Sequence, residues 1–198
     1  MSNTIRRCEP DLTYHTYSRC INKSTMMKLD YMKDLMLEVI NMALERYNFE
    51  LISYVIMDNH FHFFIRTLEN GPTISRIMQF IKSQYAQRCN KKMNRCGPFW
   101  NERFGDTIIE EQYDPISAFN YINWYIMNNP LRANYVTDSR NYKYGCIHFY
   151  LDEEYTPPVK LTYHKYFLKL GNTFQERADK FLELEEMYRK RIFPESMF

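Results

Sequence analysis

The sequence predicts an α+β fold: a ferredoxin-like antiparallel sheet of four to five strands with helices on one face, plus a C-terminal helical extension. Short runs of β-branched and aromatic residues predict four strands, and longer runs with apolar residues at helical spacing predict three long helices. These segments follow in the order β-α-β-β-α-β-α, which is typical of such a fold. At 198 residues the chain fits one domain, residues 1–150, and an extension, residues 151–198, with a charged helix over residues 174–191.

The first half of the chain predicts most of the sheet. Residues 12–19 alternate between two faces as a strand does, and residues 28–47 carry a methionine and leucine stripe typical of an amphipathic helix. Two further strands are expected over residues 51–57 and 60–67. The Asp-Asn pair between them favours a turn, so the two strands form a β-β unit.

The second long helix is predicted to open at Pro72 or Thr73, because an Asn-Gly-Pro break precedes it and apolar residues then recur at helical spacing. After this helix, residues 97–104 form a turn and an aromatic, basic stretch, and residues 104–110 predict a short strand. Trp100 in this stretch is either exposed, where it could stack on an unpaired base, or buried in a structural role.

A third helix has a clear predicted start, with Asp114 as N-cap and Pro115 in the first helical position. It is expected to end at Asn129, because a residue before proline is disfavoured in the α conformation. Tyr121, Tyr125 and Asn129 are spaced by four and share one face, although a helical tyrosine is commonly a packing residue. The expected buried stripe is Ile116, Phe119, Ile122 and Ile126.

Two histidines, His60 and His62, are predicted to point to the same side of one strand, roughly 7 Å apart along it. Two imidazoles that converge on a rigid strand can hold one divalent metal ion. The alternative is that both are core or surface histidines without a ligand. His15 on the first strand could lie near such a metal, or be structural.

Basic residues are concentrated in the middle of the chain. The net charge of the whole chain is only +2, but residues 66–106 contain eight basic and three acidic side chains, a local charge of +5. Residues 151–198 carry a local charge of −1. The cluster is either a solvated helix face or the binding surface for a phosphate backbone.

The cysteines and the apolar segments predict a cytoplasmic protein that has no membrane segment. Five cysteines are scattered without paired spacing, so we expect reduced thiols rather than disulfides or zinc ligands. No apolar run approaches the length that spans a bilayer, and the N-terminus has no apolar signal region.

Three stretches together resemble one family. Residues 54–62, which end in His-Phe-His, resemble the histidine motif of the HUH endonucleases in their single-tyrosine transposase form. Residues 97–104, Gly-Pro-Phe-Trp-Asn-Glu-Arg-Phe, and residues 125–133, Tyr-Ile-Met-Asn-Asn-Pro-Leu-Arg-Ala, are similar to segments of the REP-associated tyrosine transposases. The resemblance covers about residues 10–150. Asp58 stands where that family usually has proline, and Asn134 where it has glycine.

The resemblance implies transesterification of single-stranded DNA at hairpin-associated sites. Tyr125 would attack a phosphodiester and form a 5′-phosphotyrosine link, and His60, His62 and Asn129 would hold Mg²⁺ or Mn²⁺, with zinc credible in a purified sample. The link conserves the phosphodiester bond energy, so no nucleotide cofactor is expected. Candidate DNA contacts are Arg19, Lys82, Arg88, Lys91, Lys92, Arg95, Trp100, Arg103 and Arg132.

Other functions fit parts of this pattern. A plasmid relaxase or replication initiator would use the same chemistry, but relaxases often have a third histidine in the metal motif and a tyrosine near the N-terminus. A domesticated or catalytically silent hairpin-binding module would have lost a ligand or the nucleophile, and a His-x-His metallohydrolase would carry further Asp and His residues. The resemblance leaves a monomer and a homodimer open.

Overall fold

The computed structural model describes residues 9–192, and it confirms the predicted α+β class with an antiparallel sheet. Within those residues the sheet has four strands, β1 (Thr13–Arg19), β2 (Phe49–Ile56), β3 (His60–Thr67) and β4 (Gly105–Ile108). Their order is β2-β3-β1-β4, so the predicted metal strand β3 lies in the interior of the sheet. Residues 1–8 of the predicted domain and residues 193–198 of the predicted extension lie outside the described part of the chain.

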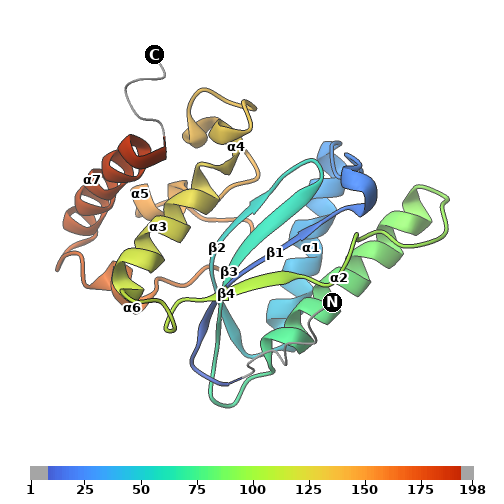
Figure 1. Cartoon of the computed structure of the whole chain (residues 1–198), viewed down its shortest axis with the longest axis horizontal. Coiled ribbons are helices and arrows are strands. Elements are labelled where there is room, and N and C mark those ends of the chain that lie inside the picture. Colours follow the sequence, from blue (N-terminus) through green and yellow to red (C-terminus); the bar gives the residue numbers. More distant parts are fainter. Residues whose placement is uncertain (1–8, 193–198) are drawn as a thin grey trace.

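Two helices, α1 (Asp30–Arg46) and α2 (Ile74–Lys92), cover one face of the sheet (Figure 1). The Oγ1 of Thr16 on β1 donates to the Sδ of Met78 on α2 at 3.5 Å, which places α2 on this face. The methionine and leucine stripe of α1 is buried as predicted, because it faces α2 and the sheet, except for Leu29, which precedes the helix and is exposed. Thr73 caps α2, and its side chain accepts a hydrogen bond from the backbone N–H of Arg76.

The helix α3 (Pro115–Met127) lies on the opposite face, over β2 and β3. Its Phe119 stacks on Phe64 of β3 with ring centroids 5.2 Å apart. The expectation of helices on one face therefore holds for α1 and α2 but not for α3. The physical reason is that β3 carries aromatic side chains on both faces, so both need cover. Asp114 caps α3 as predicted and accepts from two backbone N–H groups at 3.1 Å.

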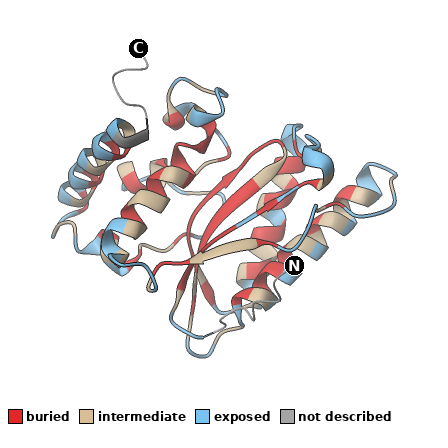
Figure 2. Ribbon diagram, in the orientation of Figure 1, coloured by how far each residue is buried: buried red, intermediate tan, exposed pale blue. Residues whose placement is uncertain are grey.

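The C-terminal helix α7 (Phe174–Ile192) forms where a charged helix was expected. Its Phe181 stacks on Trp124 of α3 at 4.3 Å, and the Trp124 Nε1–H donates to the Phe181 carbonyl at 3.1 Å. The outer side of α7 is exposed (Figure 2). The division into residues 1–150 and 151–198 stays a prediction. Shorter helices are η1 (Ile21–Lys23), α4 (Asn129–Arg132), η2 (Ser139–Asn141), α5 (His148–Leu151) and α6 (Lys165–Leu168).

Candidate active site

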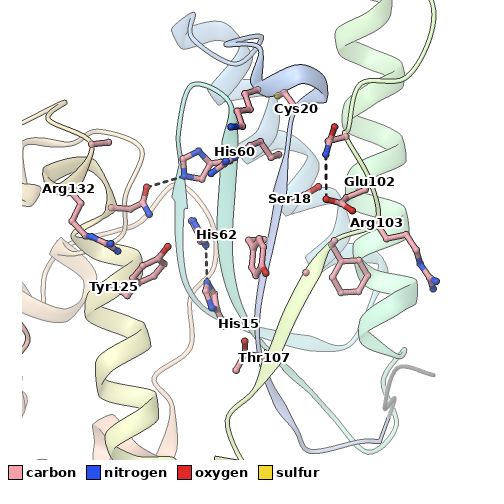
Figure 3. Close-up of a pocket in the computed structure, with 18 of the residues that line it drawn as sticks. His15, Ser18, Cys20, His60, His62, Glu102, Arg103, Thr107, Tyr125 and Arg132 are labelled. Carbon is pink, nitrogen blue, oxygen red and sulfur yellow. Dashed lines mark hydrogen bonds between the residues drawn. The ribbon is translucent and has the colours of Figure 1, made fainter. Parts of the chain in front are cut away.

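A cavity of about 1210 Å³ opens on the α3 side of the sheet. Side chains from β1, β3 and β4 form one part of its wall, and α3 and α4 form another (Figure 3). Its lining includes His15, His60, His62, Tyr125, Asn129 and Arg132. Sequence segments more than a hundred residues apart thus meet in one site.

The structure places His60 and His62 side by side, as the alternation of β3 predicts. Their ring centroids are 5.2 Å apart and their planes are perpendicular. His62 is buried, with 6% of its surface exposed, whereas His60 is half-buried at the cavity wall. The site therefore presents two imidazoles to one space, one from the interior and one closer to solvent.

A third histidine joins them. His15 on β1 lies beside His62 because β1 and β3 are neighbouring strands, and the His15 Nε2 is 2.9 Å from the His62 Nδ1. The planes of the two rings differ by 23° and their centroids are 5.1 Å apart. The sequence left the place of His15 open, and the structure puts it at the site.

Asn129 reaches the site from the first residue of α4, just beyond the end of α3. Its Oδ1 is 3.1 Å from the Nε2 of His60, while the Nδ1 of His60 is 2.6 Å from the Oδ1 of Asn59. The helix α3 thus ends at Met127, two residues before the predicted end, and Asn129 belongs to the separate short helix α4. His60 is held between two amide oxygens.

Tyr125 lies on the α3 side of the same cavity. Its ring meets the ring of His62 edge-on at 5.4 Å and that of His15 at 5.8 Å. The guanidinium of Arg132 lies over the Tyr125 ring, 4.7 Å from its centroid, a cation–π contact. Tyr121, one turn earlier on α3, instead lies against Tyr188 of α7 at 5.2 Å and does not line the cavity.

Burial keeps these histidines neutral. Desolvation lowers the pKa of His15 to about 4. The pKa of His60 is also lowered to about 4, chiefly by burial and further by the positive charge of Arg19. Burial holds the pKa of His62 well below its ordinary value, and His15, His60, Arg19 and Arg132 lower it further. Neutral imidazoles are the form that ligates metals.

The donor set around His60 fits a cation. A neutral imidazole carries one proton, so His60 can donate to only one of the two amide oxygens that face it. When it donates from Nδ1 to Asn59, its Nε2 lone pair faces the oxygen of Asn129. A cation between them, or rotation of the Asn129 amide, would relieve this. The Nε2 of His60 and the Oδ1 of Asn129, which are 3.1 Å apart, would both serve as ligands of such a cation. The described residues contain no group of three His, Cys, Asp or Glu suited to a metal, so the set depends on the amide of Asn129.

Three of the predicted DNA contacts line this cavity: Arg19, Arg103 and Arg132. Lys82, Arg88, Lys91, Lys92 and Arg95 lie on α2 or just after it and do not line it.

Most of that second group has contacts within the protein. The Lys82 Nζ donates to the Glu102 carbonyl at 2.7 Å, and the Arg95 guanidinium donates to Asn90 and to the Pro98 carbonyl. Arg88 is directed at the Met42 sulfur of α1, and Lys91 and Lys92 are exposed near the end of α2. A role for these five in DNA binding stays a prediction.

Trp100 is half-buried among aromatic rings. Its ring lies 5.3 Å from that of Phe61, and Phe99 and Tyr85 also flank it. The Nε1–H donates to the Lys82 carbonyl at 2.9 Å. The sequence left two roles open for Trp100, stacking on a base and packing within the protein. These contacts fit the packing role.

The sequence assigned no function to Tyr17, which also lines the cavity with 44% of its surface exposed. The alternation of side chains along β1 could have identified it, since Tyr17 shares a strand face with His15. Lys23, in the turn η1, is a second unassigned basic residue at the cavity.

Comparisons with known proteins agree on one family. The family model described as "Transposase IS200 like" matches residues 8–128. A Haemophilus influenzae protein named "Putative REP-associated tyrosine transposase" is 23% identical over 113 residues, which are 52% of this chain and 62% of that protein, so the match spans less than two thirds of the relative. The solved structure of a REP-associated tyrosine transposase bound to a REP hairpin superposes with a TM-score of 0.66 at 17% identity, over 84% of this chain and 96% of that one; this shows the fold.

The family model and the fold confirm the resemblance drawn from the three sequence stretches. No helix of the described residues is long and apolar enough to cross a membrane. Since the family model matches more than half of its residues, the chain belongs to the IS200-like transposase family.

Proposed function

We propose that this chain is a metal-dependent endonuclease and strand transferase that acts on single-stranded DNA beside a hairpin, with Tyr125 as nucleophile. One observation carries the proposal: a half-buried tyrosine and two neutral histidines border the same open cavity. The family model supports DNA cleavage, and the solved relative bound to a REP hairpin supports a folded single strand as the partner.

The reaction is a transesterification. The Oη of Tyr125 attacks the phosphorus and the bond to the 3′ oxygen breaks. That oxygen takes up a proton from water, so the products are a 5′-phosphotyrosine and a free 3′-hydroxyl. The phenolic proton passes to water in the open cavity, because the adjacent imidazoles have lowered pKa values and are poor bases. Rejoining is the reverse attack by a 3′-hydroxyl, so no nucleotide cofactor is consumed.

His60, His62 and Asn129 would hold the metal. Mg²⁺ or Mn²⁺ fits this mixed nitrogen and oxygen set, and when bound it polarises the scissile phosphate and offsets negative charge in the transition state. The contact of Arg132 with the Tyr125 ring orients the phenol and leaves guanidinium donors near the attacked phosphate.

Three arginines at the cavity, Arg19, Arg103 and Arg132, would contact phosphates close to the cleavage point. We assign the predicted basic residues of α2 to more distant parts of the hairpin. We place this activity in the cytoplasm, where scattered cysteines stay reduced, and in either a monomer or a homodimer.

The test is incubation of the chain with Mn²⁺ and single-stranded DNA from the flanks of its gene, including any hairpin. A band of covalent protein–DNA complex that resists denaturation is expected with Mn²⁺ and not with a chelator. The matched control is the plain duplex of the same sequence. Free DNA ends without any covalent complex would contradict the proposal, since a hydrolytic nuclease leaves no link.

A further inference from the structure

One buried contact at the site has no part in the proposed reaction. The Nε2 of His15 and the Nδ1 of His62 are 2.9 Å apart, and both side chains are less than a tenth exposed. In Figure 3, His62 lies between His60 and His15, so one side of its ring faces each. Such a short contact between two neutral rings requires one proton between them.

That proton can be bound either to the Nε2 of His15 or to the Nδ1 of His62. If His15 donates from Nε2, the proton of neutral His62 is on its own Nε2, and that nitrogen has no lone pair for a metal. If His62 donates from Nδ1, its Nε2 lone pair is free on the side of His60. Only the second arrangement is compatible with a metal shared by His60 and His62.

We propose that His15 is a positioning residue that accepts the Nδ1–H of His62 and so directs the Nε2 lone pair of His62 to the metal. This inference rests on the proposed function, which supplies the metal. Metal-bound histidines ordinarily donate their second N–H to an acceptor that fixes ring orientation, and here a second imidazole takes that place.

The fold holds His15 firmly enough for this role. It lies within β1, paired with Phe64 of β3 on one side and Thr107 of β4 on the other. Its ring also contacts Tyr17 at 5.6 Å and the edge of Tyr125 at 5.8 Å. The fold therefore fixes the Nε2 of His15 opposite the Nδ1 of His62.

The experiment measures Mn²⁺ binding to the full chain without DNA, from the free Mn²⁺ signal in electron paramagnetic resonance. His15→Phe keeps an aromatic ring but removes the acceptor, and we expect its Mn²⁺ affinity to fall about 10- to 100-fold. His15→Gln can present an amide oxygen near the place of Nε2, and its affinity should stay close to that of the wild type. His164→Phe is the matched control, because His164 is buried but does not line the cavity.

The outcomes separate the two proposals. If the wild type binds Mn²⁺ and His15→Phe binds it equally well, the role of His15 is wrong and the proposed function stands. If the wild type binds no Mn²⁺, both fail. A further measurement needs no variant: with Mg²⁺ bound, imidazole ¹⁵N NMR should find His62 and His15 each protonated on Nδ1. A proton on the Nε2 of His15, or a metal bound to that nitrogen, would overturn the inference.

Discussion

Replacing Lys33 with methionine should strongly destabilise the fold, because it leaves a carboxylate buried without its cation. The Lys33 Nζ lies 2.7 Å from the Asp58 Oδ1, and the two side chains are 6% and 9% exposed. The ammonium also lies over the rings of Tyr142 and Tyr144, at 5.7 and 5.2 Å. This pair fixes the turn that precedes His60.

The magnitude follows from the geometry. At 2.7 Å and an effective dielectric of about 20, the attraction is about 6 kcal/mol, and the desolvation of two ions offsets much of it. Removing only the lysine forfeits the attraction but leaves the desolvated carboxylate of Asp58. We therefore expect a loss of ~3–5 kcal/mol in the free energy of unfolding. For a chain of this length that lowers the melting temperature by about 6–20 °C.

Urea unfolding at pH 7 of the wild type, Lys33→Met, Asp58→Asn and the double variant measures this directly. The double variant should be more stable than Lys33→Met, because no charge is then left buried. A loss of less than ~1 kcal/mol in Lys33→Met would contradict this expectation. It would mean that Asp58 reaches water or another donor once the lysine is gone.

Three further predictions concern the site, DNA binding and the buried histidines. His60→Ala and His62→Ala should each abolish cleavage, whereas Asn129→Ala should raise the Mn²⁺ concentration needed in a cleavage titration. If the histidine variants cleave at the wild-type rate with the metal chelated, the metal site lies elsewhere. DNA binding measured by fluorescence anisotropy should fall steeply with salt and favour a hairpin-bearing single strand, and equal affinity for plain duplex would contradict this. Burial lowers the pKa of His15 to about 4 and that of His164 to about 3, so unfolding takes up protons below about pH 6.5. The contribution of these histidines to the free energy of unfolding should be constant above that pH and fall towards pH 4. Urea midpoints that are equal at pH 7 and pH 5 would show that these histidines are not buried neutral.

The sequence could predict those features that are written in local patterns. Alternation along β3 placed His60 and His62 on one face, and the cap and proline at Asp114 and Pro115 predicted the start of α3. Spacing by four placed Tyr125 near the later asparagine, although a short separate helix carries Asn129. These relations depend on backbone geometry over a few residues, so no knowledge of tertiary contacts was needed.

Features set by packing between distant segments could not be predicted. The expected stripe of α3 included Ile116, which is 48% exposed, whereas Trp124 is fully buried because α7 covers it. Similarly, a count of basic residues along α2 does not tell that Arg88 is directed at α1. Alternation put His15 and Tyr17 on one face of β1, but only the pairing of β1 with β3 brings that face to the histidines.

Tyr125 is the proposed nucleophile of this site. The most direct measurement is protease digestion of the covalent protein–DNA complex, followed by mass spectrometry of the peptide that carries the nucleotide. We predict a 5′-phosphate linked to the phenolic oxygen of Tyr125, and no complex at all from the Tyr125→Phe variant, which should still bind DNA. A link on Tyr17, Tyr121 or any other residue would contradict the claim.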